Sequence, residues 1–382
     1  MGSWMTMAQA CERLGVRPQT VYAYVSRGKL EVMPDPADSR RSLYRAEDVA
    51  VLARRKQAGR KRETVAANTL FGAEPSVPTA VSAFLRQRLY YRGQDALALA
   101  ASATVEDVAA LLWQAQQPVD FASHTALPAG PGGRLKAFTA LAQLAATGHS
   151  THGRLTRVLH AECQRLVGVM ADAFGAKPGR QPLHVRLAQG WKQPAAVADL
   201  LRTALVLLID HELTSSAFAA RIAASTGASL PACLLTGVTT LSGPLHGDAS
   251  GRVQALFGEV TRQGDDQVIA HYLSTGSPFP GFGHHLYPDG DPRAQVLLAL
   301  FDPPGVVTRF IDKVTTATGQ HPCIDVALAA LVMHHRLPDD AAFALFATAR
   351  SVGLLAHSLE QLSVAQVIRP RGRYVGIPPE TV

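Results

Sequence analysis

Residues 277–293 have the sequence Ser277-Pro-Phe-Pro-Gly-Phe-Gly-His284-His285-Leu-Tyr-Pro-Asp-Gly-Asp291-Pro-Arg293. The prolines and glycines favour a tight loop whose backbone can approach a ligand closely. Asp291 and Pro292 are typical of the N-cap and first position of a helix, predicted here over residues 294–301. Arg293 would lie in the first helical turn, where a bound anion could use both the helix end and the guanidinium. The alternative is a loop with a surface histidine and an arginine paired to Asp291.

Two further segments place polar residues at helix starts. Leu241-Ser-Gly-Pro-Leu-His246-Gly precedes a helical pattern over residues 252–260, and Pro322-Cys-Ile-Asp325 precedes the apolar run 326–332. Asp325 is predicted to be the N-cap of the second helix. The same carboxylate could act as a base if it is kept from water and aimed at a carbon acid.

A third feature is an arginine on an apolar helical face. Phe343, Phe346, Ala347 and Arg350 recur at helical spacing. A lone buried charge is very costly, so Arg350 must meet either an internal carboxylate or a substrate carboxylate. His211 follows another apolar helical pattern, where a histidine is more often a satisfied core group than a ligand.

Taken together, these motifs resemble those of the citrate synthase family. The resemblance runs from about Leu89 to the C-terminus and preserves the order and spacing of several motifs. These are Gly243-Pro-Leu-His246-Gly, Gly281-Phe-Gly-His284, Asp291-Pro-Arg293 and Pro322-Cys-Ile-Asp325, with Asp210-His211-Glu212, Ala349-Arg350-Ser and Ile368-Arg369-Pro-Arg371 in support.

The resemblance implies a mainly α, two-domain citrate synthase-like fold. A large domain would combine residues 80–245 and 350–382, and a small domain of residues 246–349 would close over the ligands. Family members are homodimers with sites at the subunit interface, so Arg369 would reach the partner's substrate. The fold would be preceded by a small winged helix-turn-helix domain.

The implied reaction is a Claisen-type condensation of acetyl-CoA with oxaloacetate, followed by thioester hydrolysis to citrate and CoA. Asp325 would remove a methyl proton, His246 would hydrogen-bond the thioester oxygen, and His284 would polarise the ketone and protonate the new alkoxide. The oxaloacetate carboxylates would be held by His211, Arg293, Arg350 and Arg369. The resemblance implies no tightly bound cofactor and no metal; acetyl-CoA is a co-substrate. A sister synthase that makes 2-methylcitrate from propionyl-CoA is an alternative.

Four positions depart from the family pattern. Asp248 stands where the family usually has a second glycine, which places a negative charge beside His246, and Ser250 stands where asparagine is usual. His285 stands where arginine is common, and Cys323 where asparagine is common. These departures concern the acyl-CoA pocket more than the oxaloacetate-binding residues.

The net charge of +7 is confined to the start of the chain. Residues 1–62 hold 13 Lys and Arg against 6 Asp and Glu, whereas the other 320 residues hold 24 of each. Such an asymmetry favours a polyanionic partner for this segment.

The basic segment has the pattern of a helix-turn-helix. Met7, Ala10 and Leu14 predict one helix stopped by Gly15, and Pro18 opens a second that ends at Gly28. Residues 30–44 predict a two-stranded wing, and the whole segment resembles MerR-like or excisionase-type winged helices. The candidate contacts to duplex DNA are Arg17, Gln19, Thr20, Tyr22, Arg27, Arg40 and Arg41. A small docking domain with a solvated basic face is the alternative.

We expect residues 1–62 to form this domain and residues 63–79, which follow the basic run 54–62, to form a linker. A second function class follows: a DNA-binding regulator whose synthase-like part senses a dicarboxylate or an acyl-CoA.

No apolar run approaches the ~18 residues of a membrane span. The four cysteines lack metal-site spacing, so the sequence predicts reduced thiols in a cytoplasmic protein without membrane association.

Overall fold

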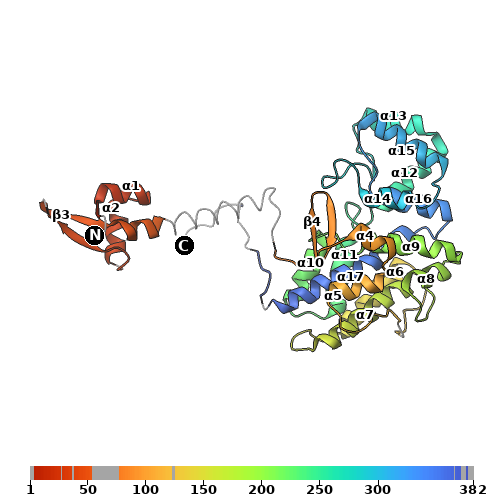
Figure 1. Cartoon of the computed structure of the whole chain (residues 1–382), viewed down its shortest axis with the longest axis horizontal. Coiled ribbons are helices and arrows are strands. Elements are labelled where there is room, and N and C mark those ends of the chain that lie inside the picture. Colours follow the sequence, from red (N-terminus) through yellow and green to blue (C-terminus); the bar gives the residue numbers. More distant parts are fainter. Residues whose placement is uncertain are drawn as a thin grey trace. The chain divides into compact units, whose positions relative to one another are not determined.

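The computed structural model describes residues 4–26, 28–36, 38–53, 77–122, 125–364, 366–370 and 376. The chain divides into two compact units, Met1–Pro78 and Thr79–Val382 (Figure 1). The basic run 54–62, Arg27 and Arg371 lie outside the described residues.

The first unit is a helix-turn-helix with a small sheet, as the sequence predicts. Its elements are β1 (Trp4–Thr6), α1 (Met7–Leu14), α2 (Pro18–Ser26), β2 (Val32–Asp35), β3 (Asp38–Arg45) and helical residues 46–53. The prediction of a two-stranded wing is confirmed, since β2 and β3 pair antiparallel. The sequence did not predict the short β1, which pairs with β3 and extends the sheet to three strands in the order β1-β3-β2.

Local sequence sets the ends of α1. Thr6 caps the helix and forms a capping box with Gln9, and Gly15 ends it at a positive φ of 58°; both are standard helix-end devices. The helices and sheet enclose a core of Ala10, Leu14, Val21, Leu30, Tyr44 and Val49.

The second unit begins with a small sheet, which the expectation of a mainly α fold does not include. Strands β4 (Ser82–Leu85), β5 (Arg88–Tyr91) and β6 (Gln94–Asp95) are antiparallel neighbours. Two-residue turns join them, Arg86-Gln87 and Arg92-Gly93, all at positive φ. Such turns match strand twist. The strands are too short for a period-two pattern, and three of the four turn residues are not ones that usually signal such turns.

The other regular elements in the described part of this unit are helices. They are α4 (Ala96–Ser102), α5 (Val105–Trp113), α6 (Arg134–Thr147), α7 (Thr156–Ala173), α8 (Leu183–Gly190), α9 (Ala195–Leu208), α10 (Ser215–Ser225), α11 (Leu230–Leu241), α12 (Ala249–Gln263), α13 (Asp265–Thr275), α14 (Pro292–Leu298), α15 (Gly305–Thr318), α16 (Ile324–His335) and α17 (Ala341–Ser363). The expectation of a mainly α fold is therefore confirmed.

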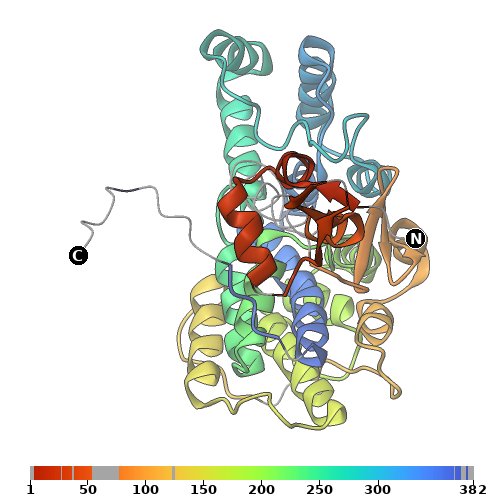
Figure 2. The ribbon, with the colours of Figure 1, turned by 90° about the vertical axis from the view of Figure 1, so that its left-hand side faces the viewer.

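Two hydrophobic cores organise these helices. The larger core lies around α9, α11 and α17, and the smaller one is built from α12, α13 and α15. Figure 1 shows the second group of helices together at one end of the unit, and Figure 2 shows the same teal and blue helices together from another side. Helix α16 contributes Ala327, Leu328 and Leu331 to the larger core and Val326 and Ala330 to the smaller. It is the wall that the two cores share.

Helix α17 runs through the larger core. By length and composition it could cross a membrane, with a mean hydropathy of 1.3, but 94% of its apolar window is buried inside the protein. A core helix meets the same criteria, so α17 is weak evidence for a membrane span. Arg350 and His357 interrupt its apolar residues, which is why no continuous apolar run marks it in the sequence.

Candidate active site

The loop at residues 277–291 is fastened to the start of α16. Phe282 and Pro322 form an isolated β-bridge, the amide of Gly283 donates to His321 O (2.9 Å), and the amide of Cys323 donates to Gly281 O (2.8 Å). Gly281 has a φ of 79°, and a Cβ there would lie 2.6 Å from Val253 and 2.9 Å from Val326. Only glycine fits between α12 and α16 at this point.

Asp325 lies in the first turn of α16, and the expectation that it caps this helix is wrong. Cys323 is the N-cap residue, with extended backbone and no side-chain cap bond. The Oδ1 atom of Asp325 accepts a hydrogen bond from Ser250 Oγ at 2.8 Å. Burial raises the pKa of Asp325, and the Ser250 hydroxyl partly opposes that shift. A carboxylate with a raised pKa and one defined partner has the properties of a general base.

Arg293 is held by its neighbour, as the alternative interpretation of the loop anticipates. Asp291 caps α14 and accepts from Arg293 Nε (3.0 Å) and Nη2 (2.8 Å), and from the amide of Ile324 (3.0 Å). Burial alone would lower the pKa of Arg293, but Asp291 outweighs it and the net shift is upward. The Nη1 atom has no hydrogen bond to any described residue, so Arg293 keeps one donor edge for a ligand.

His211 and His284 are brought together by Tyr287. His211 Nε2 lies 2.9 Å from the Tyr287 hydroxyl, and the rings of His211 and His284 are 5.8 Å apart, edge to face. Burial and then Arg293 hold the pKa of His211 well below its usual value. The guanidinium of Arg293 lies 5.1 Å over the Tyr287 ring. Tyr287 thus orders three of the predicted residues, although no sequence pattern singles it out.

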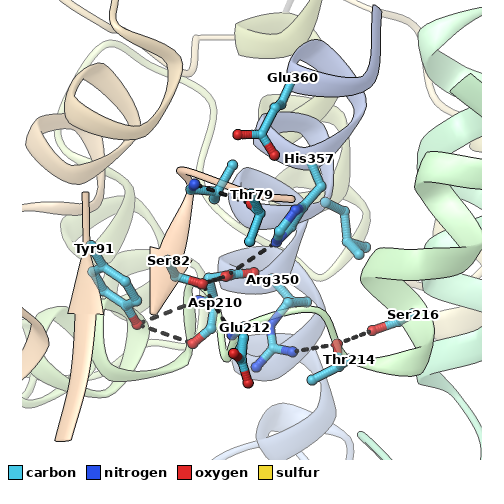
Figure 3. A network of polar contacts seen from close by, with 12 residues as sticks. Thr79, Ser82, Tyr91, Asp210, Glu212, Thr214, Ser216, Arg350, His357 and Glu360 are labelled. Carbon is cyan, nitrogen blue, oxygen red and sulfur yellow. Dashed lines mark hydrogen bonds and ion pairs between the residues drawn. The ribbon is translucent and has the colours of Figure 1, made fainter. Parts of the chain in front are cut away.

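Arg350 is buried, with 1% of its surface exposed, and it makes no ion pair with any described carboxylate. Its Nε donates to Leu208 O at 3.0 Å and its Nη1 to Thr214 Oγ1 at 3.5 Å (Figure 3). Burial lowers the pKa of Arg350, and Asp210 opposes that shift. Two bonds leave most of its five donors unused, which is unusual for a buried guanidinium and suits an incoming anion.

Hydroxyl groups connect Arg350 to His246. Thr214 Oγ1 lies 3.1 Å from Ser216 Oγ, which lies 2.8 Å from His246 Nε2. Arginine can only donate, so Thr214 accepts from it, and this leaves the Thr214 hydroxyl proton free to be donated to Ser216 and the Ser216 proton to His246. In that arrangement Nε2 is an acceptor and the proton of the neutral His246 ring is on Nδ1.

The tautomer of His284 follows in the same way. Its Nδ1 accepts from the amide of Leu286 at 3.1 Å, so the proton of the neutral ring is on Nε2. Burial, and then Arg293, lowers the pKa of His284 to about 4. Burial, and then Arg350, lowers the pKa of His246 to about 4. Both rings are therefore neutral hydrogen-bond donors near neutral pH.

These pKa values make stability depend on pH. The unfolded chain takes up protons on His246 and His284 near pH 6.5, whereas the folded chain resists until about pH 4. The free energy of unfolding should therefore fall as the pH drops from about 6.5 to about 4. In His246→Gln, the thermal unfolding midpoint measured at a series of pH values should depend less on pH than in the wild type. The exposed-residue variant His149→Gln is the matched control, and an unchanged slope in His246→Gln would contradict the assignment.

A second buried network lies behind Arg350. Asp210 Oδ2 accepts from Ser82 Oγ and lies 3.3 Å from His357 Nε2, with both Asp210 and His357 wholly buried (Figure 3). Helix α17 passes so close that a Cβ on Gly353 would lie 2.3 Å from Ile209 O. The turn that carries His211 is therefore fixed against the helix that carries Arg350.

Other predicted residues lie elsewhere. Arg369 is exposed in the C-terminal segment and has no hydrogen bond or ion pair with another described residue. A cavity of about 940 Å³ lies apart from this site and is lined by Trp113, His160 and the end of α17. The described residues hold no group of three or more His, Cys, Asp or Glu suited to a metal.

The predicted DNA contacts lie on and beside α2. Tyr22 is 60% exposed, and Arg17 and Gln19 are also exposed, whereas Thr20 is half-buried. In the wing, Arg41 is exposed and lies 3.3 Å from Asp38. Arg27 and the side chain of Arg40 lie outside what the structure describes.

Comparison with known proteins identifies the family. Residues 134–371, more than half of the chain, match the family described as citrate synthase, C-terminal domain. The chain belongs to the citrate synthase family. Residues 4–57 match a helix-turn-helix domain family.

Relatives of two kinds are similar to this citrate synthase family member. The citrate synthase of Haloferax volcanii is 31% identical over 202 residues, covering 50% of this chain and 53% of the relative. The 2-methylcitrate synthase of Shewanella oneidensis is 27% identical over 213 residues, covering 50% and 54%. This chain thus spans about half the length of the curated relatives it matches.

Solved citrate synthases share the fold over a longer stretch. The enzyme from Thermotoga maritima is 25% identical with a TM-score of 0.67, covering 81% of this chain and 96% of that chain. The enzyme from Thermoplasma acidophilum, solved in a ternary complex with carboxymethyl coenzyme A and oxaloacetate, has a TM-score of 0.69 at 21% identity, covering 82% and 97%. The second likeness supports the fold alone.

Proposed function

We propose that this chain condenses acetyl-CoA with oxaloacetate and releases citrate and CoA. The observation that carries the proposal is Arg350, a buried guanidinium without an acidic partner among the described residues, close to His211 and Arg293. Asp210 favours this cation electrostatically but makes no ion pair with it, so the guanidinium keeps donors for a further anion. A dicarboxylic acid would provide it.

The chemistry follows from the neighbouring groups. Asp325 would take a proton from the thioester methyl group, and the Nδ1–H of His246 would stabilise the enol oxygen. The new carbon–carbon bond would form at the oxaloacetate ketone, whose oxygen would accept from the Nε2–H of His284 and end as a hydroxyl. Water would then add to the thioester carbonyl and CoA would leave as the thiol. The proton that Asp325 takes balances the one that the alkoxide gains.

The domain limits and the assembly are part of the same proposal. Residues 80–245 with 350–382, and residues 246–349, would form large and small domains that close over the ligands and exclude water. A homodimer would let Arg369 of one subunit reach the other subunit's substrate, which agrees with its lack of a partner among the described residues of a single chain.

A thiol-release assay tests the function. Purified full-length protein with oxaloacetate should release CoA from acetyl-CoA. Faster release from propionyl-CoA would favour 2-methylcitrate formation instead. Binding of oxaloacetate without release from either thioester would favour a sensor of dicarboxylates over an enzyme.

The N-terminal unit supports a second function, binding to duplex DNA. Its helix-turn-helix exposes Tyr22, Arg17 and Gln19 on or beside α2, and the chain's whole excess of positive charge lies in residues 1–62. In this motif the second helix enters the major groove, and a dimer would bind two half-sites.

We expect DNA binding that weakens steeply with salt, with a log–log slope near −0.9 for each phosphate contacted. Anisotropy titrations of genomic fragments at two salt concentrations would measure it. Removing residues 1–62 should abolish binding, and Tyr22→Ala should weaken it without unfolding the unit, because this side chain is exposed. Equal retention of DNA by full-length and truncated protein would contradict the proposal. A change in DNA affinity on adding oxaloacetate or acyl-CoA would favour the regulator.

A further inference from the structure

The loop that carries His246 has little hydrophobic anchorage. Of residues 242–248, Gly247 alone is buried, and Leu245 is 91% exposed. The loop is instead held by polar contacts on either side of Gly247. Ser216 bonds His246, and Arg134 bonds Asp248. Backbone hydrogen bonds also hold the loop, among them the one from the Gly247 amide to Leu241 O at 2.8 Å. The side chains of His246 and Asp248, however, are positioned by those two contacts.

The contact between Arg134 and Asp248 is bidentate. Arg134 Nη1 donates to Asp248 Oδ2 at 2.8 Å, and Nη2 donates to Oδ1. The guanidinium also lies 3.8 Å over the ring of Phe343, on the helix that carries Arg350. A planar fork that pairs with a carboxylate and stacks on an aromatic face is a geometry that lysine cannot reproduce fully.

The side chain of Asp248 does not cap the helix that follows it. It stands at the N-cap of α12 but makes no side-chain cap bond there, although aspartate is a favoured N-cap residue. Both of its oxygens point to Arg134 instead, and Gly251 leaves room for the side chain, since a Cβ there would lie 3.1 Å from Oδ1. The side chains of Arg134 and Asp248 are 36% and 25% exposed, so this charge pair faces partly towards solvent.

We propose that Arg134 masks the charge of Asp248 so that an anionic acyl-CoA can approach His246. The inference rests on the proposed condensation. CoA carries several phosphate charges, and an unpaired carboxylate two residues from His246 would repel them, because like charges across a contact weaken association. Arg134 is thus a positioning residue that acts through Asp248. It should affect the protein's affinity for the acyl-CoA and not its affinity for oxaloacetate.

Isothermal titration of the full chain with acetyl-CoA and, separately, oxaloacetate tests this. Arg134→Gln should weaken acetyl-CoA binding about tenfold at low ionic strength, and less at roughly 0.5 M salt, where charges are screened. Oxaloacetate affinity should stay within about twofold. Asp248→Asn should bind acetyl-CoA at least as well as the wild type, and the double variant should return to within about twofold of it, because the unpaired charge is gone.

The double variant distinguishes charge from structure. If it binds acetyl-CoA as weakly as Arg134→Gln, the pair acts by holding the loop, and the inference is overturned. Unchanged binding by Arg134→Gln would overturn it too. Circular dichroism melting of each variant checks that the fold is kept, and Arg134→Lys, which keeps the charge, should stay closer to wild type than Arg134→Gln. A wild type that binds no CoA compound would sink the proposed condensation as well, whereas the other results concern the pair alone.

Discussion

Replacing Asp325 by asparagine should lower CoA release by about 10²–10⁴-fold and leave oxaloacetate binding nearly unchanged, because a general base would be lost. Asparagine has almost the same shape and can still accept a bond from Ser250 Oγ. It cannot take the methyl proton. Steady-state thiol release and titration with oxaloacetate would measure the two effects.

The structure also removes one alternative explanation of that result. Cys323, not Asp325, is the N-cap of α16, so loss of a cap should not unfold Asp325→Asn. Ser250→Ala is the matched control, because it removes the partner and keeps the base, and it should cost far less activity. Near-native turnover of Asp325→Asn would show that a group other than Asp325 takes the methyl proton.

Replacing Arg350 by lysine should weaken oxaloacetate binding roughly 10- to 100-fold although the charge is kept. A charge-assisted hydrogen bond is worth about 1.5–3 kcal/mol, and lysine cannot present the planar fork. Lysine would also lose the geometry that donates to Leu208 O and Thr214 Oγ1. Isothermal titration with oxaloacetate or citrate would show the change.

Arg221→Lys is the control for Arg350→Lys. Arg221 is equally buried, but it pairs with Glu360 at 2.6 Å and with Gln361 at 3.0 Å. Its replacement should lower the melting temperature and leave oxaloacetate affinity near native. If Arg350→Lys behaves in the same way, Arg350 has a structural role and the dicarboxylate site lies elsewhere.

The sequence was most informative where local chemistry is strong. The cap at Asp291 with Pro292 and the end of α1 at Gly15 both occur as predicted. The small sheet at residues 82–95 was missed because its strands are too short to show a period, and Tyr91 is buried there by tertiary packing.

The site could be predicted only in part. His211, His284 and Arg293 follow from motifs, and the structure brings them around Tyr287. The hydroxyls of Thr214, Ser216 and Ser250, which orient His246 and Asp325, could not be found in this way. Serine and threonine are common in every loop and helix start, so only the folded geometry reveals which of them bond a histidine or a carboxylate.

Helix α16 has neighbours on all sides, and this has a mechanical consequence. Val326 and Ala330 face the smaller core, and Leu328 and Leu331 face the larger. If the two cores turn against each other, an axis along this helix would keep its contacts with both. Groups on such an axis move least, and Asp325 lies on this helix. The proposed proton acceptor would then move little while Arg350, on α17 in the larger core, changes its position relative to the smaller core.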